Sequence, residues 1–330
     1  MNMTNLDAIT STDQLPVQAR THWSASDIPS QHGRLAVITG TGGIGFETAL
    51  ALARAGGEVI IAGRNAKKGA DAVARICADV RSAKARFEQV DLASLESITD
   101  FGTRLRSQHK SLNLLVNNAA VMNPPDRQET ADGFELQFGT NYLGHFALTL
   151  QLLPLLCLGR DARIITLSSI AARNGAINFE DLQAERSYKP MRVYSQSKLA
   201  CLMFALEFQR RSKAGRLGIA SIAAHPGISR TDLLHNAPGR WSGTGMMRTF
   251  LWFLFQPASQ GALSSLFAAT SPLARGGGYY GPARLGGMRG APAEAAIPKR
   301  ALSLGNASRL WEISERLTGM KMLVPGPTEM

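Results

Sequence analysis

Short apolar segments alternate with helix-period segments along most of this 330-residue chain. Six runs have the length and the bulky apolar side chains of buried strands, at residues 35–39, 58–62, 85–90, 112–116, 163–167 and 219–224. Between them, apolar residues recur at helical spacing in residues 46–55, 67–80, 95–108, 134–156 and 194–211. Because parallel strands need helical crossovers, this order predicts one α/β domain with a Rossmann-type, doubly wound parallel sheet.

The composition fits a globular chain, since 45% of the residues are hydrophobic. No apolar run reaches the roughly 18 residues of a membrane span, and residues 1–32 lack the apolar centre of a signal peptide. We therefore expect a cytoplasmic protein without a membrane span. Its parts are an N-terminal arm at 1–32 anchored by Trp23, the main domain at 33–282, and an extension at 283–330 that packs back through Leu310 and Trp311.

The net charge of +11 raises the question of a nucleic-acid partner. The basic clusters, at residues 67–68 and 210–216, contain no interleaved aromatic residues, so solvated helix faces explain them better and no nucleic-acid site is predicted. The three cysteines lie far apart in apolar sequence, which favours reduced thiols over a disulfide or a metal site: Cys77, Cys157 and Cys201.

A glycine-rich segment follows the first predicted strand and opens the first helix. It has the form GxGxxG, with glycines that allow a tight turn and a close backbone approach to a pyrophosphate at a helix N-terminus: Gly40, Thr41, Gly42, Gly43, Ile44 and Gly45. After the second strand stands Arg64, where a carboxylate would favour NAD(H). A guanidinium suits the 2′-phosphate of NADP(H), so NADP(H) is the preferred cofactor and NAD(H) stays open.

Other polar or turn-forming residues come at the ends of the remaining strands, where ligands bind in sheets of this kind. Asp91 can meet the adenine amino group or cap the next helix. A hydroxyl of Ser168 or Ser169 can face a substrate oxygen. The remaining candidates around the cofactor are Asn118, Ala119, Pro226, Gly227, Ile228 and Thr231.

Tyr194 and Lys198 are four residues apart in a predicted helix and therefore share one face. An ammonium beside a phenol favours the phenolate, so the tyrosine can give a proton to a carbonyl or take one from an alcohol. Such a pair also occurs by chance, and the motifs before it strengthen the interpretation. Asn141 interrupts an apolar helix, which indicates a local role, and His145 is interpreted as a packed, hydrogen-bonded histidine.

The order of these motifs resembles the short-chain dehydrogenase/reductases. The residues that carry the resemblance are Thr39-Gly40, Gly43-Ile44-Gly45, Asp91, Asn117-Asn118-Ala119, Asn141, Ser169, Tyr194, Lys198, Pro226-Gly227 and Thr231. Residues 137–146 and 278–282 are similar to the branch that contains retinol dehydrogenases and protochlorophyllide reductases.

The resemblance implies roles for four residues. Tyr194 would be the acid/base, and Lys198 would assist it and bind the nicotinamide ribose. Ser169 would hold the substrate oxygen, and Asn141 would fix a water that links Lys198 to solvent. The resemblance also implies a homodimer or homotetramer, whose interface could use the long helices at 134–156 and 194–211.

Two positions depart from the family pattern. The family has three residues between the first two glycines of its motif, whereas only Thr41 and Gly42 stand between Gly40 and Gly43. This shorter loop puts its usual contact to the adenosine phosphate in doubt. Ala120 stands where the family has glycine, so a methyl group should crowd the backbone near the cofactor.

The substrate lid of the family would correspond to residues 228–256. This segment contains aromatic and methionine side chains that suit a bulky apolar substrate, a core contact, a subunit contact or a membrane surface equally well: Trp241, Met246, Met247, Phe250 and Trp252. The sequence thus predicts an NADP(H)-dependent oxidoreductase that interconverts a carbonyl and an alcohol on a bulky, largely apolar small molecule. The alternatives are a regulatory or scaffolding homologue, a C=C reductase and an epimerase.

Overall fold

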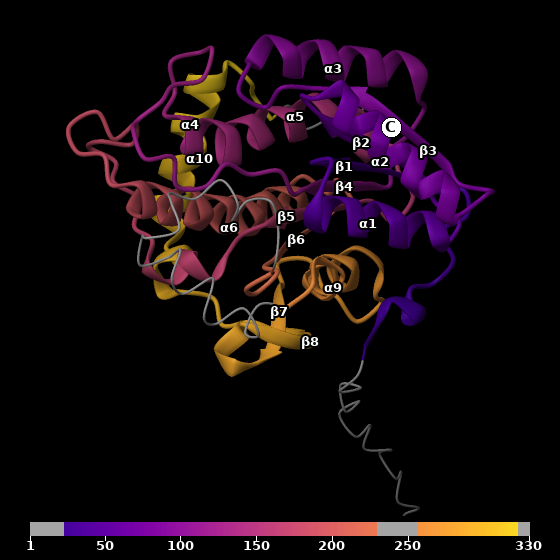
Figure 1. Cartoon of the computed structure of the whole chain (residues 1–330). Helices are drawn as coiled ribbons and strands as arrows, with labels where there is room; N and C mark the ends of the chain where they lie inside the picture. The colour runs from indigo at the N-terminus through magenta and orange to yellow at the C-terminus, as the bar shows by residue number, and fades with distance from the viewer. Residues whose placement is uncertain (1–22, 230–255, 323–330) are drawn as a thin grey trace, which may run out of the picture.

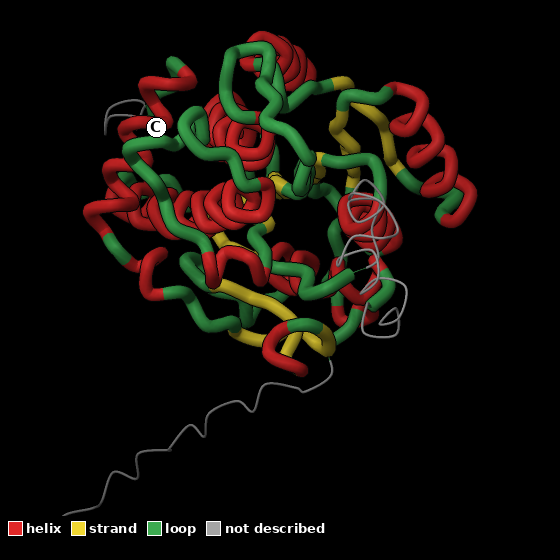
Figure 2. The backbone as a smooth tube through the Cα atoms, turned by 60° about the vertical axis from the view of Figure 1, so that its left-hand side comes forward, coloured by secondary structure: helices red, strands yellow, loops and turns green. Residues whose placement is uncertain are grey.

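The computed structural model describes residues 23–229 and 256–322, which form a central sheet between two layers of helices (Figures 1 and 2). The sheet has eight strands in the order β3-β2-β1-β4-β5-β6-β7-β8 among the described residues. Strands β1 to β7 are parallel, and β8 is antiparallel to β7. The predicted Rossmann-type sheet is confirmed.

The strands are β1 (Leu35–Thr39), β2 (Glu58–Gly63), β3 (Lys84–Gln89), β4 (Leu114–Asn117), β5 (Arg163–Leu167), β6 (Ala220–Ala224), β7 (Tyr279–Arg284) and β8 (Arg289–Glu294). The α-helices are α1 (Gly43–Arg54), α2 (Ala66–Asp79), α3 (Leu95–Gln108), α4 (Leu136–Phe138), α5 (Gly144–Cys157), α6 (Pro190–Ala214), α9 (Ala258–Thr270) and α10 (Leu304–Thr318). None of the described helices is both long and apolar enough to cross a bilayer.

Successive strand residues face opposite layers, so the sheet builds two separate cores. In β1, Val37 packs with the residues of α3, α5, α6 and α10, whereas Ile38 packs with those of α1, α2 and α9. Both side chains are fully buried. This two-sided burial explains why the strands read as continuous apolar runs in the sequence.

The sheet continues beyond residue 282, where the sequence suggested the end of the main domain. β7 pairs with β6 only through Tyr279 and Tyr280, so Pro282 lies beyond the parallel pairing. β8 is the edge strand, and its Pro292 lies opposite Pro282. An edge strand tolerates proline because one side of its backbone needs no ladder bond. Glycine and proline therefore concealed two strands that the sequence analysis missed.

The single helix predicted at 134–156 is wrong in its centre. α4 and α5 are joined by a π-helical turn, Gly139–Leu143, which contains the buried Asn141. A π-turn has one residue more than an α-turn and is common at functional sites. The apolar spacing continues on both sides of it, which is why the sequence did not reveal the break.

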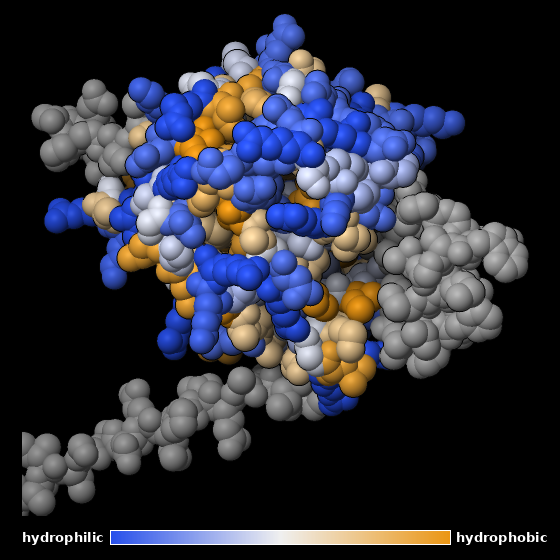
Figure 3. All heavy atoms as spheres, turned by 90° about the vertical axis from the view of Figure 1, so that its left-hand side faces the viewer, coloured by the Kyte–Doolittle hydropathy of each residue, from blue (hydrophilic) through white to orange (hydrophobic). Residues whose placement is uncertain are grey.

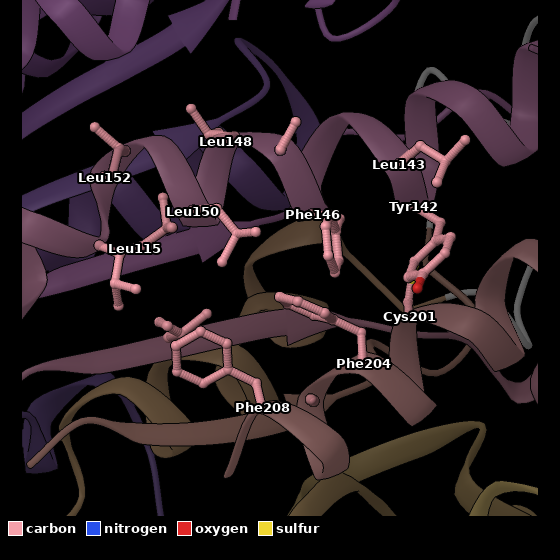
Figure 4. Packing of buried hydrophobic residues seen from close by; sticks show 14 of the residues in the cluster. Leu115, Tyr142, Leu143, Phe146, Leu148, Leu150, Leu152, Cys201, Phe204 and Phe208 are labelled. Atoms are coloured by element: carbon pink, nitrogen blue, oxygen red, sulfur yellow. The ribbon is translucent and has the colours of Figure 1, made fainter. Parts of the chain in front are cut away.

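Helix α10 packs onto α5 and α6 through the buried side chain of Trp311. The indole stacks on Phe204 with ring centres 5.8 Å apart and contacts Phe146 edge-on at 4.9 Å. Figure 4 shows Phe146 from α5 facing Phe204 from α6. The guanidinium of Arg211 also contacts the indole, 4.5 Å from the ring centre. Leu310 and Trp311 are both buried in the core formed with these helices, and the oligomeric state stays a prediction.

We expect Trp311→Ala to lower the free energy of unfolding by about 3–5 kcal/mol, because it removes a buried indole and leaves a cavity between three helices. Glu312→Ala, at the exposed neighbouring position of α10, should change it by less than about 0.5 kcal/mol. Urea denaturation of both variants measures the difference. Equal stabilities would show that α10 does not stabilise the domain.

Candidate active site

The glycine loop lies where β1 passes into α1. Gly40 and Gly43 have φ angles of +101° and +52°, in the left-handed region that favours glycine. A Cβ on Gly45 would lie 2.6 Å from Nδ2 of Asn118, so glycine is also needed there for close packing. The loop thus exposes the first turn of α1, where free N–H groups can bind a phosphate.

The hydroxyl of Thr39 connects this loop to the end of β4. Its Oγ1 accepts hydrogen bonds from the backbone N–H groups of Asn118 and Ala119, each at 2.9 Å. It also lies 2.9 Å from Nε2 of His145 and 3.3 Å from the carbonyl oxygen of Val116. The carbonyl oxygen of Thr39 accepts a further bond from Asn118 Nδ2 at 2.6 Å.

His145 is buried, as predicted, and its hydrogen bonds fix its tautomer. Nδ1 lies 2.9 Å from the carbonyl oxygen of Asn141, which can only accept, so Nδ1 carries the proton. Burial lowers the pKa of His145 to about 4; the bond to Asn141 opposes the shift and the charge of Lys198 adds to it. The ring is therefore neutral at pH 7, and Nε2 accepts the proton of the Thr39 hydroxyl.

Asn141 holds the segment after β4 against helix α6. Its Oδ1 accepts from the N–H of Val121 at 2.7 Å, and its Nδ2 donates to the oxygen of Val121 and to Oγ of Ser197. The backbone oxygen of Asn141 accepts from His145 and from the thiol of Cys201. The side chain therefore ties two walls of the site together, and the water predicted at Asn141 remains a prediction.

Tyr194 and Lys198 face one cleft from helix α6. Both side chains are almost fully buried, with residue exposures of 6% and 3%. Nζ of Lys198 donates to the carbonyl oxygen of Leu167 at 3.1 Å and lies 5.9 Å from the centre of the tyrosine ring. The Tyr194 hydroxyl has no hydrogen-bond partner in the part of the chain that the structure describes, so it is free to bond a ligand.

The two serines after β5 use their hydroxyls differently. Ser168 donates to the backbone oxygen of Lys198 at 2.7 Å and so ties β5 to α6. Ser169 accepts from the N–H of Ala171 at 3.2 Å and caps the short helix Ile170–Asn174. The Ser169 hydroxyl keeps its proton for another acceptor, which agrees with the substrate contact that the resemblance implied without testing it.

These elements enclose a cleft of about 230 Å³ at the carboxyl ends of the strands. It is lined by the glycine loop, the segment after β4, the end of β5, helix α6 and the turn after β6: Gly40, Gly42, Gly43, Ile44, Asn118, Ala119, Ala120, Leu167, Ser168, Tyr194, Lys198 and Pro226. Ala120, which departs from the family's glycine, is one of the lining residues. Predicted site residues from five separate segments are thus brought together.

The model of the short chain dehydrogenase family matches residues 34–240. The chain belongs to this family. Among its relatives, polyprenol dehydrogenase from Mus musculus is 40% identical over 298 residues, 88% of this chain and 86% of the relative. Retinol dehydrogenase 13 from Mus musculus is 39% identical over 303 residues, 89% and 86% of the two chains. The predicted branch is confirmed, and the protein is an oxidoreductase of that branch.

Solved structures share the fold. An uncharacterized protein from Mycobacterium paratuberculosis has a TM-score of 0.75 at 37% identity, covering 91% of this chain and 99% of its own. RhlG from Pseudomonas aeruginosa in complex with NADP has a TM-score of 0.60, covering 76% and 94%. Its 23% identity shows the fold alone.

Arg64 and Asp91 lie outside the lining of the cleft. Arg64 is exposed directly after β2, and the preceding Gly63 packs against Thr41 of the glycine loop, where a Cβ would lie 3.0 Å from the threonine methyl. Arg64 therefore flanks the loop of this short-chain dehydrogenase. Oδ1 of Asp91 accepts from the N–H of Ala93 at 3.0 Å, whereas Ser94 caps α3. The adenine contact of Asp91 stays a prediction.

The sequence analysis missed the hairpin β7–β8 beside the site. The hydroxyl of Tyr279 donates to the backbone oxygen of Ser169 at 3.4 Å, and burial raises the pKa of Tyr279 to about 12. At the hairpin turn, Arg173 donates to Gly286 O at 2.7 Å, and Ile228 N–H donates to Met288 O at 2.9 Å. The two adjacent tyrosines at 279–280 could have indicated a strand, but glycines stand on both sides of them.

Some of the remaining cofactor candidates lie in the described part of the chain and others do not. Gly227 has a φ of +68°, and a Cβ there would lie 2.3 Å from Met288 O. Gln256, the first residue described after the gap, bonds through Nε2 to Pro226 O at 2.6 Å. Most of the predicted lid lies outside the described residues. So do the candidates Thr231, Trp241, Met246, Met247, Phe250 and Trp252.

We expect the His145 network to lose stability in acid. Its pKa is about 4 in the folded chain, below the ordinary 6.5, so between these values the unfolded chain takes up a proton that the folded chain does not. Stability therefore falls as the pH drops, and His145 accounts for about 2 kcal/mol of the loss between pH 7 and pH 5.

Urea denaturation of the wild type and of His145→Gln at both pH values measures this share. The variant should lose about 2 kcal/mol less than the wild type over the same interval. Its remaining loss includes that of His225, whose pKa burial also lowers to about 4. An identical pH dependence in the two proteins would contradict the neutral, buried state of His145.

Proposed function

We propose that this protein is an NADP(H)-dependent oxidoreductase that interconverts a carbonyl and an alcohol on a bulky, largely apolar small molecule. The observation that carries the proposal is the free hydroxyl of Tyr194, buried beside Lys198 in a cleft whose opposite wall is the glycine loop. Family membership supports the oxidoreductase class. A proton donor facing a dinucleotide loop is the arrangement that carbonyl reduction requires.

The glycine loop fits a dinucleotide because its turn, with positive φ at Gly40 and Gly43, lines the cleft and leads into the first turn of α1, whose free N–H groups can bind a phosphate. When bound, the cofactor supplies or accepts the hydride. Tyr194 gives its proton to the carbonyl oxygen in reduction and takes it back in oxidation. Lys198, fixed by Leu167 O, places a positive charge 5.9 Å from the centre of the phenol ring. The Ser169 hydroxyl donates to the same substrate oxygen and stabilises the developing charge.

The preference for NADP(H) is supported by the surroundings of Arg64. The side chain is exposed beside the glycine loop, and no described carboxylate pairs with it. Lys67 and Lys68, exposed in the first turn of α2, add positive charge nearby. A 2′-phosphate at this edge would meet a guanidinium with its donors free.

The apolar character of the substrate is supported by the names of the relatives, which are dehydrogenases of retinol and of polyprenol. On the face in Figure 3, hydrophilic side chains predominate and the hydrophobic ones form small separate groups among the described residues. An apolar substrate would therefore be held in the cleft rather than on an open patch of this face.

Tyr194→Phe tests the acid/base role. Removing the hydroxyl should lower kcat for NADPH-dependent reduction of retinal by about 10²–10⁴-fold, since the substrate oxygen loses its proton donor. NADPH binding, followed by cofactor fluorescence, should stay within about threefold, as the ring remains. Tyr188→Phe is the matched control, because that hydroxyl bonds Pro124 O outside the cleft lining. A Tyr194→Phe enzyme with full activity would refute the mechanism.

Arg64→Gln tests the cofactor preference. Losing the guanidinium should weaken NADPH binding by about 10–100-fold and leave NADH binding within about twofold, because only NADPH carries the 2′-phosphate. Arg81→Gln, an exposed arginine between α2 and β3, controls for the change in net charge. Equal losses for both cofactors would show that Arg64 does not recognise the phosphate.

A further inference from the structure

A second cavity, of about 470 Å³, lies at the other ends of the strands, away from the cleft. The residues that line it come from the turns that enter β1, β2, β3 and β4, so the cavity is at the amino ends of four neighbouring strands. None of its lining residues belongs to the cleft of Tyr194 and Lys198. The proposed oxidoreductase mechanism therefore leaves it without a role.

Three cationic side chains line this cavity without a carboxylate partner. Arg34, Lys84 and Lys110 form no ion pair with any residue in 23–229 or 256–322. One carboxylate, Glu58, also lines the cavity, and it pairs with Arg86 at 2.7 Å. Asp161 lies outside the lining, where it pairs with Arg160 at 3.6 Å and its charge also acts on Arg34. The cavity therefore has an excess of positive charge.

Arg34 also has an unused hydrogen-bond donor. One guanidinium nitrogen, NH2, donates to the backbone oxygen of Asp161 at 3.1 Å, whereas its Nε is buried and has no acceptor among the described residues. Burial lowers the pKa of Arg34, and the charge of Asp161 opposes that shift. A half-buried guanidinium with an unpaired donor is costly unless an acceptor binds there.

Two histidines and two serines also line the cavity. Nε2 of His109 contacts the guanidinium of Arg86 and must act as the acceptor, so the N–H of its ring is on Nδ1. The ring of His32 lies against Gly56, where a Cβ would come within 2.5 Å of it. The hydroxyls of Ser82 and Ser111 add further donors. The cavity is thus rich in donors as well as in positive charge.

We propose that this cavity is a binding site for a small polyanion that carries phosphate groups. Phosphate oxygens would accept from Arg34 and pair with Lys84 and Lys110, which come from three different turns. The volume is that of a small-molecule pocket, and the concave shape distinguishes it from a flat basic surface for a protein partner. The site goes beyond the proposed function, because it acts on neither the cofactor nor the carbonyl.

The test is isothermal titration of the full chain with inorganic pyrophosphate at low salt. Lys84→Gln/Lys110→Gln should weaken binding by about tenfold or more, since two charge-assisted contacts are lost. The control Lys213→Gln/Lys299→Gln makes the same change in net charge at exposed positions outside the cavity and should stay within about twofold. Both lysine pairs are exposed, so both double variants should fold.

Two outcomes would overturn the proposal. The first is a wild-type chain that does not bind pyrophosphate. The second is equal binding by the two double variants, which would place the anion at the glycine loop or elsewhere. Neither result depends on turnover, so failure of this site is separate from failure of the proposed oxidoreductase activity.

Discussion

The hydroxyl group of Thr39 stands at the junction of the three segments that shape the cleft. It accepts two backbone N–H groups from the end of β4 and gives its proton to His145, which in turn donates to the π-helical turn at Asn141. Only the direction of the bond between Thr39 and His145 depends on a neutral imidazole. Because an imidazolium would have to donate to Thr39 as well, protonation would leave that oxygen with three donors and force the loop to rearrange.

This junction also explains how a shorter glycine loop is accommodated. Gly40 and Gly45 both pack against the side-chain amide of Asn118. This amide donates to the carbonyl oxygen of Thr39, and the backbone N–H of Asn118 donates to the Thr39 hydroxyl. The base of the loop is therefore set by contacts to β4, and a missing residue changes only the turn above that base. The turn begins α1 at Gly43, so the free N–H groups of the helix still face the cleft.

The sequence was sufficient to predict a strand where an unbroken run of apolar residues determined its structure. β1 and β5 have the predicted bounds because strands buried on both faces form unbroken apolar runs. β7 and β8 could not be predicted from their glycines and prolines. Pro282 is tolerated because it lies beyond the pairing of β7 with β6, and Pro292 because β8 is the edge strand. The residue types of the site were likewise readable, but the hydroxyl directions of Ser168 and Ser169 depend on contacts with α6 and with the following turn.

Helix α6 is held at the end of β5 by two hydrogen bonds of Lys198, one from its backbone and one from its side chain. The backbone oxygen of Lys198 accepts from Ser168, and its ammonium donates to Leu167 O. These two bonds fix the lysine along and around the helix axis, and Tyr194, one turn earlier on the same face, is carried with it. The position of the phenol in the cleft is therefore set by the carboxyl end of β5. Thr39 anchors the glycine loop at the carboxyl ends of the neighbouring strands. The proton donor and the dinucleotide loop are therefore both fixed to the ends of neighbouring strands of one sheet.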